Sequence, residues 1–338
     1  MDVAFRSVAS TSHRMATNDK PMADISAARA AELIQSLSPR AVEALNAMAR
    51  DALWTRGGRA GSGLGSLIEA LWGFMLNGQL DGGEESENLH LAWFPDHAYN
   101  DFALIFADRA WNPSTRDGEL LRVEAKSMFS DADESKGHFD VIQSEIQDDD
   151  LLLVLVWEWF SIRQINDGAD QVVAPQVTRS FIGPARIIAT LRDELHLARG
   201  GSFVSPPCPD GCPPGCSHIG EPLNADGKRE RRSGPESRKP RSASYAANFG
   251  GLVRMLKTNS EGARTAFRRL RKCSDLVHEF VSFIHAAFPD EEANQYLVSE
   301  WREVAAELGI DGAGRMARRE LIAQVRMLPQ YRDALRRL

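Results

Sequence analysis

Residues Leu151 to Phe160 form a nearly unbroken apolar run, and this run constrains the fold more than any other segment. Its length suits a β-strand and is too short to cross a membrane. A strand that is apolar in both side-chain directions is buried on both faces. The chain therefore predicts a β-sheet that is covered by other structure on each side.

A predicted β-hairpin lies before this strand, between Asp101 and Lys126. Two strand-like runs are joined by Arg109 to Gly118, a stretch rich in turn-forming residues. If Asp101 pairs with Lys126, Ala103 faces Glu124, and the even positions 102 to 106 share an apolar face with odd positions 121 to 125. The opposite face then carries Asp101, Glu124 and Lys126, and a one-residue slip would place that polar set in the apolar layer. Two carboxylates beside an ammonium group suit divalent-metal binding and phosphodiester hydrolysis.

The remaining segments up to residue 200 alternate between helical and strand-like patterns. The expected helices are Ile25 to Leu53 with a break at Ser38 and Pro39, Ser66 to Leu76, His138 to Gln147, and Ala185 to Leu197. The further expected strands are Leu89 to Phe94 and Gln176 to Ile182. This order predicts an α/β fold, with a mixed β-sheet flanked by helices.

Four regions are expected along the chain. Residues 1–25 read as a disordered N-terminus, and residues 26–200 as the α/β domain. Residues 201–244 are crowded with Pro, Gly, Cys and charged residues and read as a linker. Residues 245–338 follow a helical pattern and predict an all-α C-terminal domain.

Charge is distributed unevenly between the two parts of the chain. Residues 1–200 carry 18 basic and 30 acidic groups, a net −12, whereas residues 201–338 carry 22 and 17, a net +5. This asymmetry predicts a basic part that meets a polyanion. No apolar run has membrane-spanning length, and the first twenty residues lack a signal-peptide core. We expect a soluble cytoplasmic protein with no membrane partner.

The hairpin residues resemble the motif of the PD-(D/E)XK nuclease superfamily, which includes many restriction endonucleases. The resemblance rests on Asp101, Glu124 and Lys126, with Glu69 on the preceding helix, and covers about residues 60–195. It implies a restriction-endonuclease-like core in which Asp101 and Glu124 hold Mg²⁺ or Mn²⁺. Lys126 would activate the attacking water and stabilise charge on the phosphate. Glu69 would be a further metal ligand and Gln143 an active-site neighbour.

Two alternatives stay open at this motif. The literal Pro-Asp pair ends at Asp96, so Asp96 is the fallback for Asp101. An acid-x-Lys triplet also occurs at Lys136 and Lys228, but only Lys126 lies in an alternating strand opposite an Asp-led strand. The second alternative is a solvated hairpin face with an ordinary Glu–Lys pair.

The linker contains a compact group of metal-ligating residue types. Three cysteines and one histidine can fill a tetrahedral Zn²⁺ shell, which predicts a structural zinc loop. The alternatives are a disulfide or free thiols. The four residues are Cys208, Cys212, Cys216 and His218, and Cys273 is left over.

Two basic segments are candidates for contact with nucleic acid. Lys228 to Arg241 is a polycationic stretch that includes Arg231 and Arg232. Glu300 to Val325 resembles the SAP and Rho N-terminal type of helix–loop–helix module. That resemblance implies nucleic-acid contact by three arginines and a small core of six apolar residues, with an ordinary helical hairpin as the alternative. The arginines are Arg315, Arg318 and Arg319, and the core residues are Val304, Leu308, Ile310, Met316, Leu321 and Ile322.

Together these features predict a Mg²⁺-dependent endodeoxyribonuclease. By analogy with the superfamily, it would act in a bacterial restriction or anti-phage system. One alternative is a non-catalytic, zinc-containing nucleic-acid-binding protein with a degenerate nuclease fold. Others are a nuclease acting on RNA or damaged DNA, and a helical interaction scaffold. A homodimer would suit cleavage of both strands, but the sequence reveals no interface.

Overall fold

The computed structural model describes the chain in separate stretches. They are residues 25–56, 62–81, 86, 88–94, 100–131, 137, 139, 143, 146–165, 170–198, 202–203, 222–223, 251–256, 261–289, 292 and 296–338. The predicted disordered N-terminus lies almost entirely outside these residues, as does nearly all of the linker. The predicted helix His138 to Gln147 is also mostly outside them, although Gln143 lies in a 3-10 turn.

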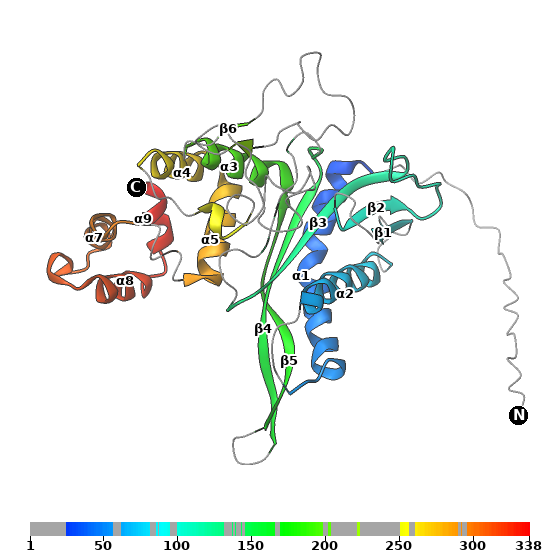
Figure 1. Cartoon of the computed structure of the whole chain (residues 1–338), viewed down its shortest axis with the longest axis horizontal. Helices are drawn as coiled ribbons and strands as arrows, with labels where there is room; N and C mark the ends of the chain where they lie inside the picture. The colour runs from blue at the N-terminus through cyan, green and yellow to red at the C-terminus, as the bar shows by residue number, and fades with distance from the viewer. Residues whose placement is uncertain are drawn as a thin grey trace, which may run out of the picture.

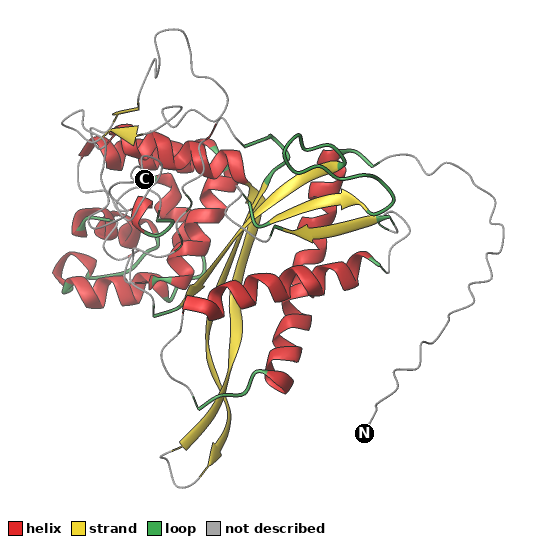
Figure 2. Cartoon of the chain, turned by 45° about the vertical axis from the view of Figure 1, so that its right-hand side comes forward, coloured by secondary structure: helices red, strands yellow, loops and turns green. Residues whose placement is uncertain are grey.

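A five-stranded mixed sheet forms the centre of the α/β part, with the strands side by side in chain order. β3 and β4 are parallel and the other neighbours are antiparallel. Helices lie on both sides of the sheet (Figures 1 and 2). The predicted fold class, a mixed sheet flanked by helices and followed by a helical C-terminal region, is confirmed at this level. The strands are β1 (Leu89–Trp93), β2 (Phe102–Phe106), β3 (Glu119–Phe129), β4 (Leu151–Ile165) and β5 (Asp170–Pro184).

A separate two-stranded sheet pairs β6 (Ser202–Phe203) with β7 (Pro222–Leu223).

The helices divide into those before the five-stranded sheet and those after it. The first helices are α1 (Ala27–Ala52) and α2 (Ser62–Leu80), and α3 (Ala185–Ala198) follows β5 directly. The C-terminal helices are α4 (Glu261–Cys273), α5 (Asp275–Ala287), α7 (Val298–Glu307), α8 (Arg318–Arg326) and α9 (Tyr331–Arg337).

β4 is buried on both faces, as its apolar run predicts. Leu151, Leu153 and Leu155 join the core beneath α1 and α2. The alternate residues, Leu152, Val154 and Val156, join a second core with α3 and the C-terminal helices. Since strand side chains alternate between the two faces of a sheet, one strand supplies both cores.

The hairpin register differs from the prediction by two residues. Phe102 lies opposite Val123 and Ala103 opposite Arg122, whereas the sequence-based register placed Ala103 opposite Glu124. From Phe102 to Leu104 this shift of two keeps each side chain on its predicted face, because the strand period is two, whereas a β-bulge after Leu104 places Ile105 opposite Glu119. The hydrophobic pattern therefore determined the faces correctly, but it could not distinguish registers that differ by an even number.

The predicted break in the first helix is wrong. α1 continues from Ala27 to Ala52 with Pro39 inside it. The apolar stripe includes Ile34, Ala41 and Leu45, so it lies on both sides of the proline and is buried throughout. Proline removes one backbone hydrogen bond, but packing of this stripe against the sheet and α2 outweighs that loss.

An asparagine from a helix closes each outer edge of the sheet. Asn77 of α2 accepts a hydrogen bond from Leu91 N at 2.7 Å and donates to Leu91 O at 3.0 Å on edge strand β1. Asn46 of α1 makes the same pair of bonds with Val177 of edge strand β5, both at 2.8 Å. A carboxamide carries one donor and one acceptor side by side and thus replaces a missing strand at these points.

β4 and β5 extend past the other strands as a two-stranded ribbon (Figure 1). At Val173, which lies opposite Ser161 within the ribbon, Thr55 pairs with β5 through two backbone hydrogen bonds of 2.8 and 2.9 Å. The segment after α1 therefore supports the ribbon on its outer side.

The α7–α8 segment has the predicted helix–loop–helix form, and its six predicted core residues are all buried or partly buried. They belong to the large core shared with α5 and the sheet rather than to a small core of their own. This difference arises because α7 packs against α9, which in turn packs against α4, so the α7–α8 segment does not stand apart.

Candidate acid–lysine site

Asp101 lies at the entrance to β2 and reaches across to β3. Its backbone N donates to Val123 O at 3.1 Å, and its carboxylate Oδ2 accepts from Ala125 N at 2.8 Å. The preceding residue, Asn100, has a φ of 79° and is 3% exposed. Asparagine tolerates this left-handed conformation better than most residues, and it turns the chain so that Asp101 meets the neighbouring strand.

Asp101, Glu124 and Lys126 meet around one ammonium group. Lys126 Nζ lies 2.6 Å from Glu124 Oε1 and 3.9 Å from Asp101 Oδ2. The side chains of Glu124, Lys126 and Asp101 are 8%, 21% and 33% exposed, respectively. The structure therefore brings together the three residues that the sequence singled out, with Glu124 buried and Lys126 and Asp101 partly exposed.

The charges in this cluster stabilise one another. Burial by itself lowers the pKa of Lys126, but the adjacent carboxylates of Glu124 and Asp101 outweigh this effect. The net pKa of Lys126 therefore lies above its ordinary value. A lysine in this environment stays protonated at neutral pH and acts as a fixed cation.

Glu69 reaches the same cluster from α2. Its Oε1 accepts a hydrogen bond of 2.6 Å from Ser127 N, the residue after Lys126. Burial raises the pKa of Glu69 to about 7, with Lys126 lowering it and Asp101 raising it further. The sequence predicted Glu69 as a neighbour of the site, but it did not indicate Ser127, whose backbone N–H provides the contact.

Gln143, the last predicted active-site neighbour, is tied to a helix. Its Nε2 donates to Thr190 Oγ1 on α3 at 2.6 Å, and Thr190 in turn donates to Arg186 O at 2.9 Å. None of the described contacts of Gln143 reaches the acid–lysine cluster. Asp96, the fallback for Asp101, lies outside the described residues.

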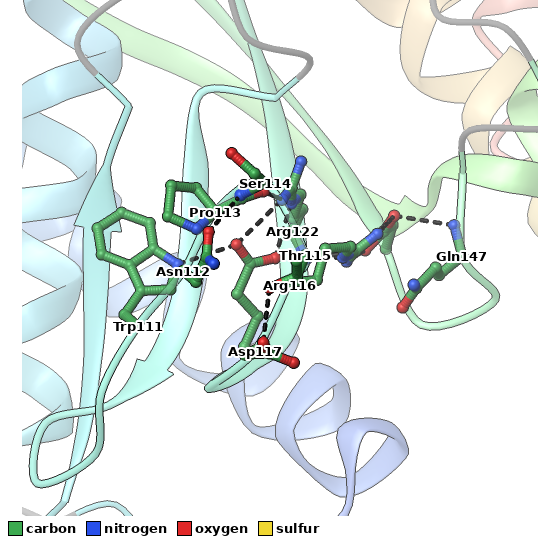
Figure 3. Close-up of polar contacts among 11 residues, drawn as sticks. Trp111, Asn112, Pro113, Ser114, Thr115, Arg116, Asp117, Arg122 and Gln147 are labelled. Atoms are coloured by element: carbon green, nitrogen blue, oxygen red, sulfur yellow. Dashed lines mark hydrogen bonds and ion pairs between the residues drawn. The ribbon is translucent and has the colours of Figure 1, made fainter. Parts of the chain in front are cut away.

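The buried carboxylate of Asp150 links β3 and the β2–β3 loop to β4. Asp150, fully buried at the start of β4, accepts two hydrogen bonds from Arg116, at 2.6 and 3.0 Å, and one of 2.8 Å from Arg122 N on β3. It also accepts from Gln147 N at 2.9 Å, and Glu119 binds both arginines (Figure 3). The β2–β3 loop is thereby attached to β4. The network was not predicted from the sequence, where its only signal was an acidic residue directly before an apolar strand.

Oxygen ligands for a hard cation are available at the acid–lysine cluster. Asp101 and Glu124 could hold a divalent metal, with Glu69 as a further oxygen donor. Among the described residues, no group of three or more His, Cys, Asp or Glu side chains forms a ready-made metal site. The predicted zinc ligands Cys208, Cys212, Cys216 and His218 lie outside the described residues, and Cys273 is an exposed free thiol.

Three sets of arginines in the C-terminal half bear on the predicted contact with nucleic acid. Arg315, Arg318 and Arg319 are exposed at the loop and first turn before and within α8. Two arginines of α4 bind acids: Arg268 binds Glu261 and Glu300, and Arg269 binds Glu194. Arg231 and Arg232 lie outside the described residues.

Comparison with known proteins found no matching family model, no matching curated protein and no matching solved structure. Within the described stretches, no helix is both long enough and apolar enough to span a membrane. The nature of the site is therefore inferred from its own geometry.

Proposed function

We propose that this protein is a divalent-metal-dependent endonuclease that hydrolyses DNA phosphodiester bonds. The observation that carries the proposal is the convergence of Asp101 and Glu124 on the Lys126 ammonium group, at 3.9 and 2.6 Å. Glu124 and Lys126 lie within β3, and Asp101, directly before β2, is bonded to β3 through Val123 O and Ala125 N; paired strands hold catalytic groups more rigidly than loops do. A role in restriction or anti-phage defence remains the expectation from the superfamily resemblance.

A bound Mg²⁺ or Mn²⁺ is part of the proposal and would rest on two carboxylates, since the described residues hold no group of three or more metal-ligating side chains. The carboxylates of Asp101 and Glu124 lie 3.9 and 2.6 Å from a single ammonium group, so the partly buried cluster has an excess of negative charge. Carboxylate oxygens are the ligands that Mg²⁺ prefers. Asp101 and Glu124 would hold the metal, which would supply a more acidic bound water and polarisation of a phosphate oxygen.

Lys126 contributes charge rather than a base. Because the pKa of Lys126 is raised by its carboxylate neighbours, the ammonium form persists at neutral pH. A fixed ammonium group beside the scissile phosphate would stabilise the charge that builds up on its oxygens. We therefore assign Lys126 to transition-state stabilisation.

DNA is the proposed substrate because of the basic C-terminal half. The exposed Arg315, Arg318 and Arg319 lie together around the start of α8, where they can contact phosphates. The acidic α/β part would then supply the chemistry and the basic helical part the affinity.

Plasmid cleavage tests the proposal. Unmethylated plasmid, methylated plasmid and single-stranded RNA are incubated with purified protein and Mg²⁺ or Mn²⁺. We expect wild-type protein to cut DNA, and Glu124→Gln and Lys126→Met to be roughly 100- to 1,000-fold slower. Glu158→Gln, which alters an exposed glutamate on neighbouring strand β4, serves as the matched control and keeps wild-type activity.

The other outcomes discriminate between the alternatives. DNA binding without cleavage by wild-type protein under all metal conditions would indicate a non-catalytic binding protein. Preferential cleavage of RNA would overturn the choice of substrate but not the assignment of the site.

A further inference from the structure

α2 carries a single charged residue, Glu69, between two glycines that face the same way. Gly65, Glu69 and Gly73 are each four residues apart. Residues at this spacing lie on one face of a helix, on successive turns. The two glycines therefore flank Glu69 on the side of α2 that meets the sheet.

Both glycines lie against residues that directly follow members of the acid–lysine cluster. A Cβ atom on Gly73 would lie 2.5 Å from the ring of Phe102, the residue after Asp101. A Cβ atom on Gly65 would lie 2.7 Å from Ser127 Oγ, the residue after Lys126. Real Cβ atoms essentially never make contacts this short, so α2 can lie this close to β2 and β3 only without these side chains.

Close packing of α2 is what allows Glu69 to reach the site. The Glu69 carboxylate accepts a hydrogen bond of 2.6 Å from Ser127 N. Outward displacement of α2 would lengthen this bond. Two other glycines of the same helix, Gly63 and Gly78, face open space, since a Cβ atom on either would meet no atom within 4 Å. Among these four glycines, the close approach is confined to the inward pair.

We infer that Gly65 and Gly73 are positioning residues that seat α2 on the sheet so that Glu69 contacts the acid–lysine cluster. The inference deepens the proposed function and rests on it where cleavage is the readout. Phe102 is 2% exposed and packs edge-on against Trp72, with ring centroids 5.9 Å apart. Because the Phe102 ring is buried, we expect α2 rather than the ring to shift when Gly73 gains a side chain.

The central experiment compares four single variants of the full-length chain. Gly73→Ala must lengthen a contact from 2.5 Å to the 3.4 Å of ordinary packing, a displacement of about 0.9 Å. Since a misplacement of about 1 Å costs roughly 100-fold in rate, we expect kcat to fall about 10- to 100-fold with KM changed less than about threefold. We expect a smaller fall in kcat for Gly65→Ala, because the Ser127 hydroxyl can rotate away from the added methyl group. Gly63→Ala and Gly78→Ala are matched controls and keep wild-type kinetics.

A second readout does not depend on activity. The Ser127 amide donates a hydrogen bond to Glu69. Its hydrogen exchange, followed by NMR, therefore reports how close α2 lies to β3. We expect exchange about tenfold faster in Gly73→Ala and unchanged in Gly78→Ala. Shortening the obstructing ring in Gly73→Ala/Phe102→Leu should restore both exchange and kcat to the level of the single Phe102→Leu variant. A general loss of stability would not produce this recovery.

The cleavage assay and the exchange measurement distinguish failure of the proposed nuclease function from failure of the positioning role. If wild-type protein cleaves no substrate, the proposed function fails, while Ser127 exchange still decides whether the glycines seat α2. If folded Gly73→Ala keeps wild-type exchange at Ser127 and wild-type kcat, the positioning role is overturned. If Gly73→Ala does not fold, Gly65→Ala decides through the same two measurements, and wild-type values for both overturn the role.

Discussion

At the scale of single residues, Glu69 is a carboxyl group whose ionised form is disfavoured by burial. Burial raises its pKa from 4.5 to about 7, and the ammonium group of Lys126 offsets part of that effect. The folded protein thus holds a proton on Glu69 at pH values where the unfolded chain has lost it. This proton links stability to pH in a definite direction.

We expect the free energy of unfolding to fall as pH rises from about 4.5 to about 7, owing to Glu69. Below that window the group is protonated in both states, and above it the buried charge is at its most costly. Glu69→Gln removes the cost, so at pH 8 this variant should be about 1–3 kcal/mol more stable than wild type. Urea titrations at pH 5 and pH 8, with EDTA to remove divalent cations, measure the difference.

A matched variant isolates the effect of burial. Glu158→Gln alters an exposed glutamate and should change stability equally, and only slightly, at both pH values. Equal stability of Glu69→Gln and wild-type protein at pH 8 would contradict the assignment of a buried charge at Glu69.

At the scale of whole elements, the helices also terminate the sheet. An exposed edge strand offers unpaired backbone groups to other chains. Asn77 satisfies Leu91 on β1, and Asn46 satisfies Val177 on β5. The same helices that cover one face of the sheet therefore also protect its two edges at these positions.

We expect Asn77→Ala to destabilise the protein by about 1–3 kcal/mol, because Leu91 loses both of its side-chain partners. Asn46→Ala should behave alike at the other edge. Chemical denaturation gives the loss of stability, and thioflavin T fluorescence on warming reports edge-to-edge association. Gln79→Ala, in the same helix as Asn77, is the control, and a loss in Asn77→Ala no larger than in this control would count against the edge role.

At the scale of the whole molecule, the sheet and the C-terminal helices share an apolar core. Phe181 of β5 packs against Phe280 and Phe283 of α5, with ring centroids 5.1 and 5.7 Å apart. Val154 and Val156 of β4 belong to the same cluster as Trp301 and Leu321. The predicted division at residues 201–244 therefore separates segments of sequence, whereas the core continues across it.

We predict a single cooperative thermal transition for the whole chain in differential scanning calorimetry. Phe280→Ala should lower stability by about 3–5 kcal/mol and shift that transition as a unit, because the core spans both parts. Phe74→Ala, which alters a phenylalanine that is 69% exposed on α2, should shift it little. Two resolved transitions, with only one sensitive to Phe280→Ala, would show that the parts unfold independently.

Local patterns predicted the structure correctly where they had one physical solution. The run from Leu151 has no polar face, so it had to be a doubly covered strand. The alternation around Glu124 assigned each hairpin residue to a face. It left the register uncertain by two residues, because registers that differ by two present the same faces.

Local patterns misled where distant packing outweighed a local preference. Pro39 should interrupt a helix by its own chemistry, yet α1 continues through it because apolar residues on both sides are buried. The arginines of α4 likewise meet acids from other segments, such as Glu194 and Glu300. These acids are far from α4 in the sequence, so no local pattern predicts the ion pairs.

The sequence by itself determined the strand faces, and with them the gathering of Asp101, Glu124 and Lys126 on one side of a hairpin, because alternation in a strand is a local property. Only the tertiary structure decided how near α2 lies to that hairpin, and hence that Glu69 contacts Ser127. The distance between a helix and a sheet depends on which side chains are missing where they meet, as at Gly65 and Gly73. It is a property of two surfaces in contact, which neither segment specifies alone.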